Sequence, residues 1–185
     1  MAILKIARMG HPVLYERAAR VEDISSPEIQ RLIDDMLETV ADASGAGLAA
    51  PQVYRSLRMF VWRVPASRSE GAEDPSAEMQ VLINPEITPQ GDGMVLRREG
   101  CLSITGLQGW VPRYERIRYA GCDRSGQRIE GVASGFRANV MQHEMDHLDG
   151  ILYPMRMTDL RLLAFDEEAM RFPPFKGQDA GGERG

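Results

Sequence analysis

The sequence predicts an α+β domain in which short antiparallel strands pack around a central buried metal-binding helix. Three observations lead to this class: an amphipathic helix pattern near the start, several short apolar segments in the middle, and a late helical segment that is apolar on both sides. Strands and helices in separate runs favour α+β over repeated βαβ units. We expect one catalytic domain over residues 1–172 and a disordered tail at 173–185.

The composition is that of an ordinary soluble globular protein, with 43% hydrophobic and 26% charged residues in a chain of 185. The chain has 22 Lys and Arg against 27 Asp and Glu, a net charge of -5, and it shows no direct nucleic-acid motif. No apolar run approaches the ~20 residues that span a bilayer, and no signal-peptide pattern is present. We therefore expect a cytoplasmic protein with no membrane contact.

The first half of the chain is expected to form one long helix and one strand. Ser26 followed by Pro27 is typical of a helix start, and apolar residues then recur at helical spacing, which predicts a helix over 27–43. The following Gly-rich segment lacks the Lys and the preceding strand of a phosphate-binding loop. Residues 57–64 are strand-like, and 66–79 have the composition of an exposed loop.

The second half is expected to contain short strands and two helices. The strands are predicted at 81–83, stopped by Asn84, then at 94–98, 114–122 and 127–132, with Gly131 marking a bulge. Ser134 and Gly150 bound a helix of about four turns. Thr158 is the expected cap of a C-terminal helix that ends before Pro173.

The segment Gln142-His143-Glu144-Met145-Asp146-His147 carries the H-E-x-x-H pattern. Residues four apart share one helix face, so both imidazoles can reach a single metal ion, with Glu144 beside them. Alternatively, the same sequence pattern could place two histidines on a solvent-exposed helix face with no metal. Apolar residues on both sides of the helix favour burial, and buried imidazoles need partners for their ring nitrogens. These apolar residues are Phe136, Val140, Met141, Met145 and Leu148.

Two histidines leave a metal site incomplete, because a catalytic zinc-like site has three protein ligands and one open position. Cys101, between Gly100 and Leu102, is a candidate for the third ligand. From its local sequence alone, however, a cysteine between glycine and leucine is more often a small buried hydrophobic residue than a ligand. Cys122 is interpreted as simple burial, and no C-x-x-C pair suggests a disulfide.

Three segments together resemble the peptide deformylase family. They are G-x-G-L-A-A-x-Q at 45–52, E-G-C-L-S at 99–103 and Q-H-E-x-D-H at 142–147. The resemblance extends from about Ile6 to Asp159, and it implies that Cys101, His143 and His147 hold one divalent metal ion per chain. Fe²⁺ is the expected native ion, while Zn²⁺, Ni²⁺ or Co²⁺ suit the same ligands.

The activity that the resemblance implies is removal of the N-formyl group from the formyl-methionine of nascent polypeptides, with release of formate. A bound divalent cation lowers the pKa of its water from 15.7 to about 7, so hydroxide can attack the formyl carbon at neutral pH. Glu144 would act as general acid and base. The Gln52 amide and the Leu102 backbone N–H would stabilise the oxyanion.

The resemblance also implies a substrate groove. Glycines would let substrate backbone lie against enzyme backbone, and Phe136 and Val140 would wall the methionine pocket, although Asn139 is polar there. Three positions depart from the usual family residues: Ala46 for a branched aliphatic residue, Thr105 for proline, and Gln108 for a substrate-facing arginine. The expected substrate-binding set is Gly45, Ala46, Gly47, Gly100, Gln108, Phe136, Asn139 and Val140.

Two other functions fit parts of the pattern. A non-catalytic paralogue could keep the metal fold, although a structural site has no use for the retained Glu144 and Gln52. An H-E-x-x-H metallopeptidase would need a downstream carboxylate ligand, because no histidine follows His147. Docking on the ribosome near the exit tunnel occurs in some family members, whereas the charge of this C-terminal region is not basic.

Overall fold

The protein, described here by a computed structural model over residues 2–174, has an α+β fold with two antiparallel sheets, as the sequence predicts. Their strand orders are β1-β2-β3-β6-β7 and β4-β5-β8. The strands are β1 Gly47–Ala49, β2 Met59–Val64, β3 Ala77–Pro89, β4 Met94–Cys101, β5 Ile104–Tyr114, β6 Arg116–Cys122, β7 Arg128–Ser134 and β8 Ala164–Phe165. The helices are α1 Pro27–Asp42, α2 Gly135–Leu148 and α3 Asp166–Arg171, with short 3-10 turns between elements.

Helix α1 begins where the sequence predicts and ends one residue earlier. The Ser26 hydroxyl accepts a hydrogen bond from the Ile29 backbone N–H at 3.3 Å, and Pro27 occupies the first turn. This cap satisfies a donor that the first helical turn leaves without a partner. The buried face of α1 then packs on the five-stranded sheet.

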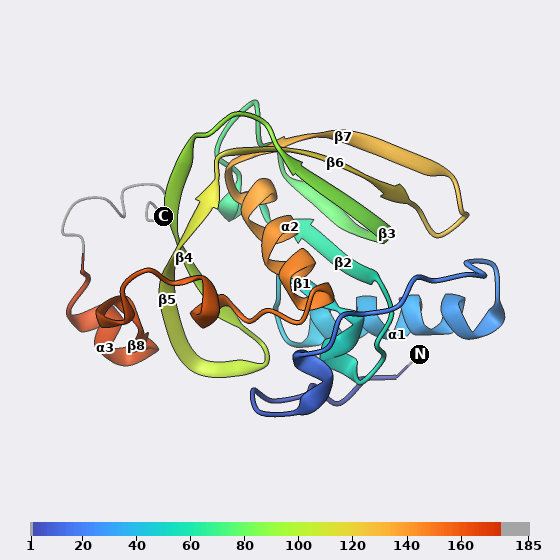
Figure 1. The fold of residues 1–185 in the computed structure, drawn as a ribbon, viewed down its shortest axis with the longest axis horizontal. Coiled ribbons are helices and arrows are strands. Elements are labelled where there is room, and N and C mark those ends of the chain that lie inside the picture. The colour runs from blue at the N-terminus through green and yellow to red at the C-terminus, as the bar shows by residue number, and fades with distance from the viewer. Residues whose placement is uncertain (1, 175–185) are drawn as a thin grey trace.

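Strand β2 shows how the two main helices share that sheet. Met59 and Val61 belong to the hydrophobic cluster under α1, whereas Phe60 and Trp62 belong to the cluster under α2. Successive side chains of a strand point to opposite faces, so β2 is buried on both. The sheet therefore lies between α1 and α2, and α2 crosses the middle of the molecule between this sheet and the β4–β5 hairpin (Figure 1).

The sequence predicts that Ser134 caps the start of α2, but a distant residue, Asp74, caps it instead. The Ser134 hydroxyl donates to the Glu73 carbonyl at 3.1 Å. The Asp74 carboxylate accepts the backbone N–H groups of Phe136 and Arg137 at 2.8 and 3.3 Å. The Asp74 side chain is 2% exposed, and its hydrogen bonds tie the loop before β3 to the helix that carries the H-E-x-x-H pattern.

The predicted stop at Asn84 is wrong, because β3 runs through it from Ala77 to Pro89. Asn84 has a left-handed φ of 50°, and its side-chain amide exchanges two hydrogen bonds of 2.9 Å with the Val21 backbone. The pairing with β6 shifts register between Ile83 and Glu86. A bulge thus carries the strand past a proline that would otherwise interrupt it.

Two further expectations also differ from the structure. The pairing of β6 with β7 keeps one register through Gly131, so no bulge occurs there. The hairpin strand β5 covers Ile104–Tyr114, where no strand was predicted before Tyr114. It pairs with β4 along nearly its whole length and brings Gly100 opposite Gln108.

The predicted C-terminal helix is shorter than expected. Residues 160–162 form a 3-10 turn, β8 then pairs with Leu107 and Gln108 of β5, and α3 covers only Asp166–Arg171. This pairing places the end of the described chain beside β5 (Figure 1). Most of the predicted disordered tail lies outside the described residues. Within residues 2–174, no helix is both long and apolar enough to cross a bilayer.

We expect Asp74→Ala to lower the free energy of unfolding by about 1–3 kcal/mol, because two buried backbone donors would lose their acceptor. Urea denaturation of the metal-loaded protein measures this change. Glu78→Ala, at an exposed position on β3 just after this loop, is the matched control and should change the stability by less than about 0.5 kcal/mol. Equal stability of the two variants would contradict the capping role.

Candidate active site

Cys101, His143 and His147 come together although they lie on separate elements. Cys101 is the last residue of β4, and the two histidines lie one turn apart on α2. One potential ligand atom from each residue lies within 4.8 Å of the others, and Cys101 Sγ is 3.2 Å from His147 Nε2. A thiolate and two imidazoles are a donor set typical of zinc and other borderline divalent ions. The arrangement therefore fits a metal ion.

Glu99 holds one of these histidines in place. Its carboxylate lies 2.8 Å from His143 Nδ1, which leaves Nε2 as the ring nitrogen free for a metal. Arg113 donates two hydrogen bonds to the same carboxylate, at 2.7 and 2.9 Å. Burial opposes ionisation, but the hydrogen bonds from Arg113 and His143 lower the pKa of Glu99 to about 2. Glu99 is therefore a buried carboxylate that stays charged.

The same guanidinium reaches α2. Arg113 donates to Asp146 at 2.6 Å, and Arg156 donates to the other oxygen of Asp146 at 2.8 Å. The side chains of Arg113 and Asp146 are 4% and 8% exposed. Strand alternation could have revealed part of this arrangement, because Glu99 and Cys101 are two residues apart and share one face of β4. No local pattern pointed to Arg113.

Glu144 lies beside the three potential ligands and has an oxygen without a partner. The residue is 3% exposed, and its Oε2 atom makes no hydrogen bond within the described part of the chain. Burial raises the pKa of this carboxyl to about 7. Gly47 lies against it so closely that a β-carbon at position 47 would be 2.7 Å from the Glu144 carboxyl carbon. A base with a pKa near neutrality is suited to proton transfer at physiological pH.

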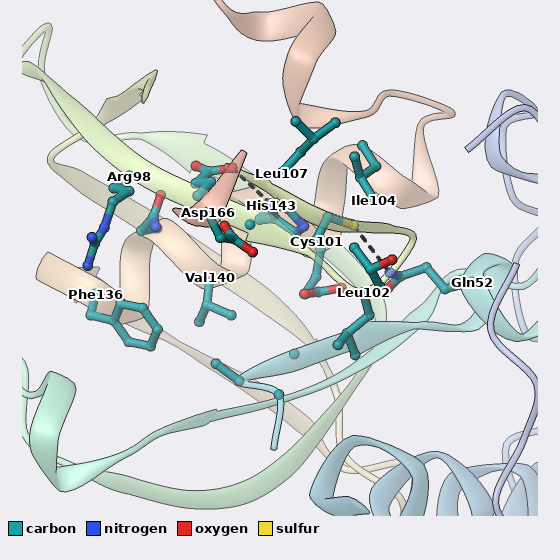
Figure 2. Close-up of a pocket in the computed structure, with 18 of the residues that line it drawn as sticks. Gln52, Arg98, Cys101, Leu102, Ile104, Leu107, Phe136, Val140, His143 and Asp166 are labelled. Atoms are coloured by element: carbon teal, nitrogen blue, oxygen red, sulfur yellow. Dashed lines mark hydrogen bonds and ion pairs between the residues drawn. The ribbon is translucent and has the colours of Figure 1, made fainter. Parts of the chain in front are cut away.

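Gln52 is fixed at its oxygen and presents its nitrogen to the site. Its Oε1 accepts the Ala49 backbone N–H at 2.8 Å, which leaves Nε2 to donate. That nitrogen lies 3.2 Å from Ser103 Oγ and 3.6 Å from Cys101 Sγ (Figure 2). The side chain is 1% exposed. Its N–H donors therefore have a fixed direction, as a group that stabilises negative charge requires.

A cavity of about 370 Å³ opens above these residues. Figure 2 shows Phe136 and Val140 on one side of it and Cys101, Leu102 and Gln52 on the other. His147, whose Nε2 lies 3.2 Å from Cys101 Sγ, is 1% exposed and does not line the cavity. The prediction that Gln108 contacts the substrate is not supported, because Gln108 does not line the cavity. It lies in the middle of the second sheet, paired with Gly100 on one side and Ala164 on the other. The predicted residues that line the cavity are Gly45, Ala46, Gly47, Gln52, Gly100, Cys101, Leu102, Phe136, Asn139, Val140, His143 and Glu144.

Three charged residues at the cavity were not anticipated from the sequence. Arg68 follows β2, Arg98 lies on β4, and Asp166 begins α3. Arg98 precedes the motif segment by one position, yet nothing local distinguishes it from Arg97, which pairs with Glu70. Asp166 reaches the cavity only because β8 pairs with β5, a contact between residues distant in sequence.

The fold and the site together define a metal-dependent hydrolase. Two imidazoles and a thiolate would hold the ion, a buried carboxylate would supply a base, and a fixed amide would supply a hydrogen-bond donor in the wall of a partly apolar cavity.

The comparisons with known proteins narrow this class to one family. The family model described as polypeptide deformylase matches residues 3–162. Peptide deformylase 1 of Nitrosomonas europaea is 47% identical over 166 residues, which covers 89% of this chain and 93% of that protein. Peptide deformylase 1 of Bordetella pertussis is 48% identical over 163 residues, covering 88% and 92%. The chain belongs to the peptide deformylase family and is therefore an enzyme of the peptide deformylase class.

Solved structures agree in fold. The Met-Ala-Ser-bound class I type b peptide deformylase of Acinetobacter baumannii superposes with a TM-score of 0.77 at 36% identity, covering 84% of this chain and 98% of that one. A peptide deformylase of Synechococcus elongatus in complex with actinonin has a TM-score of 0.77 at 35% identity, covering 95% and 88%. The resemblance noted in the sequence is thus confirmed at the level of family and fold.

We expect Glu99→Gln to weaken metal binding by about 10- to 100-fold, because a neutral amide holds the ring of a ligating histidine less firmly than a carboxylate does. Competition between Zn²⁺-loaded protein and a coloured chelator measures the affinity. Glu130→Gln, at an exposed site on β7, is the control and should leave it unchanged. An unaltered affinity in Glu99→Gln would show that the His143 contact does not support a metal site.

Proposed function

We propose that this enzyme removes the formyl group from the N-formylmethionyl terminus of nascent polypeptides and releases formate. The observation that carries this function is the buried Glu144 carboxylate, whose unpartnered oxygen lies beside Cys101, His143 and His147 at a cavity with an apolar side. The Acinetobacter baumannii relative was solved with Met-Ala-Ser bound, which is the peptide left when formyl-Met-Ala-Ser loses its formyl group.

Cys101, His143 and His147 would hold the divalent cation, with Fe²⁺ proposed as the native ion. When bound, the cation would polarise the formyl carbonyl and supply a water that ionises near neutral pH. Burial opposes thiolate formation at Cys101, but His147 and His143 lower the pKa of this thiol well below its usual value. Glu99 keeps His143 in the orientation that leaves Nε2 free. The donor set thus favours the charged thiolate that metal binding needs.

Glu144, Gln52 and Leu102 would carry out the chemical steps. Glu144 takes a proton from the attacking water and delivers it to the departing α-amine, a transfer that suits its raised pKa. The Gln52 Nε2–H and the Leu102 backbone N–H donate to the formyl oxygen as negative charge develops on it. Gln52 needs no reorganisation, because Ala49 already fixes its amide.

The methionine side chain would lie against Phe136 and Val140, which share the His143 face of α2. Gly45, Gly47 and Gly100 would border the substrate backbone, and the absence of side chains permits close approach. Gly47 has a second role, because any side chain there would displace Glu144.

The alternatives fit the structure less well. A non-catalytic metal protein gains nothing from a buried carboxylate with an unpartnered oxygen, which has an energetic cost. A metallopeptidase with a downstream carboxylate ligand does not match the described residues, where the group that could hold a metal is Cys101, His143 and His147. Docking at the ribosome stays a prediction, as does a cytoplasmic location.

The proposed reaction is tested by formate release from formyl-Met-Ala-Ser under anaerobic conditions with Fe²⁺-loaded protein. Glu144→Ala should lower kcat by about 10²- to 10⁴-fold while retaining bound metal, because it removes the proton-transfer group and none of the ligands. Gln52→Leu should lower kcat by about 10²-fold or more, since one oxyanion donor is lost.

Controls for this experiment are acetyl-Met-Ala-Ser and an internal peptide without a formyl group, and neither should be cleaved. Formate release that persists at the same rate in Glu144→Ala would exclude this carboxylate as the base. Absence of formate from metal-loaded, folded wild-type protein would refute the proposed function.

A second prediction concerns the glycine beneath the base. Gly47→Ala should lower kcat by about 100-fold with little loss of metal, because the added methyl group displaces the Glu144 carboxyl. Gly93→Ala is the matched control, since there the methyl group meets only the exposed side chain of Glu115, which can move aside. Steady-state kinetics and metal analysis of both variants measure these effects. Equal kcat values for Gly47→Ala and Gly93→Ala would contradict the role of Gly47 in positioning Glu144.

A further inference from the structure

Two arginine side chains line the cavity of the candidate active site without a carboxylate partner. Arg98 lies on β4, and Arg68 ends the short 3-10 turn that follows β2. Within residues 2–174, neither guanidinium forms a hydrogen bond or an ion pair. The adjacent Arg97, in contrast, is paired with Glu70. Both cavity arginines are exposed, so their positive charges are accessible to a bound molecule.

The two charges lie at the same end of the cavity. The Arg68 guanidinium is 5.4 Å from the centroid of the Phe136 ring. Figure 2 shows Arg98 at the Phe136 end as well, away from Cys101 and Gln52. Phe136 belongs to the wall proposed for the substrate methionine. The charges are therefore placed beside the part of the cavity that an extended substrate reaches after its formyl group.

One carboxylate lines the same cavity and pairs with neither arginine. Asp166 forms no ion pair within the described part of the chain. Burial, and then the negative charges of Cys101 and Asp166, raise the pKa of Tyr153, whose ring stacks on His143 at a centroid distance of 6.3 Å. Asp166 is thus associated with the His143 side of the cavity. The Phe136 end keeps an excess of positive charge.

Strand β4 determines which way Arg98 points. Glu99 faces the protein interior, where its carboxylate contacts His143 and Arg113. Successive side chains of a strand point to opposite faces, so Arg98 and Gly100 share the other face of β4. Both of these residues line the cavity. A substrate backbone beside Gly100 therefore has Arg98 as its next neighbour on that face.

This register indicates which substrate residue meets the arginines. In the proposed function, the formyl group lies at Cys101 and Leu102, so an extended peptide leaves the metal end along β4 towards Arg98. The first and third side chains of such a peptide point to the same side, roughly 7 Å apart, and the second points away. With the first side chain against Phe136, the third lies on the side of Arg98 and Arg68. A carboxylate there is attracted, and an ammonium group is repelled.

We propose that the enzyme prefers substrates whose third residue is Asp or Glu, with Arg98 and Arg68 attracting the carboxylate. This inference rests on the proposed deformylase function and adds a sequence preference to it. Exposed ion pairs contribute modestly to binding and are screened by salt, so the preference is a matter of several-fold and depends on ionic strength.

The test uses peptides of the form formyl-Met-Ala-Xaa-Ala with an amidated C-terminus, where Xaa is Asp or Asn. Amidation and the fourth residue are needed, because the free carboxylate of a tripeptide would itself lie at the third residue. Asp and Asn differ in charge and hardly in shape. The measured quantity, the charge ratio, is kcat/KM for the Asp peptide divided by kcat/KM for the Asn peptide. This ratio cancels any general loss of activity or metal.

We expect a charge ratio of about three to ten for the wild type at low ionic strength, falling towards one at about 0.5 M salt. Arg98→Gln and Arg68→Gln should each lower the charge ratio at least about twofold, and the double variant should bring it close to one. Arg118→Gln, at an exposed position on β6 that does not line the cavity, removes the same charge and should leave the ratio unchanged.

Three outcomes would overturn the inference while the deformylase function stands, because formate would still be released. They are a wild-type charge ratio near one, an equal fall of the ratio in Arg118→Gln, and an equal preference for Asp at the second residue in formyl-Met-Xaa-Ala-Ala amide. Release of formate from none of the peptides by metal-loaded, folded protein would refute the proposed function and this inference with it.

Discussion

The buried ion network of Glu99, Arg113 and Asp146 joins the two parts of the site. Cys101 lies on the β4–β5 hairpin, whereas both histidines lie on α2, so the three potential ligands meet only if hairpin and helix keep a fixed relation. Arg113, on β5, donates to Glu99 beside Cys101 and to Asp146 between the histidines. Buried charges are costly unless paired, and here each charge has an opposite partner and several hydrogen bonds. The network therefore specifies the docking geometry more than it adds stability.

Other polar contacts hold the remainder of α2. Asp74 caps its first turn, and the Gln142 amide exchanges hydrogen bonds of 3.0 and 2.9 Å with the Tyr114 backbone at the end of β5. At the other end, Arg58 donates to Asp149 and to the Leu148 carbonyl. A helix buried on both sides cannot be positioned by a single apolar face. Directional side-chain hydrogen bonds from other elements fix the position and rotation of α2, which hydrophobic packing alone does not determine.

The parts that the sequence predicted well depend on neighbours along the chain. Helix α1 follows from Ser26, Pro27 and its apolar spacing, and the spacing of His143 and His147 placed both on one face of α2. The errors involve partners that are distant in sequence. Asn84 continues β3 because it bonds to Val21, and Asp74 caps α2 across 62 positions. No local propensity encodes such contacts, and the same holds for Arg113 and for Asp166 at the cavity.

The site also constrains elements that carry no chemistry. Glu144 has a raised pKa because it is buried, and part of that burial comes from the close approach of β1 at Gly47. Any larger residue there would move the carboxylate or let water reach it, and either change would bring its pKa closer to that of an exposed carboxyl. The glycine-rich segment before Gln52 thus does more than leave room for the proposed substrate backbone. It sets the environment of Glu144, the proposed base, while the Ala49 backbone N–H fixes the Gln52 amide of the turn that follows. The proposed base, Glu144, and the proposed oxyanion donor, Gln52, are therefore both in contact with one short stretch of chain, residues 45–52.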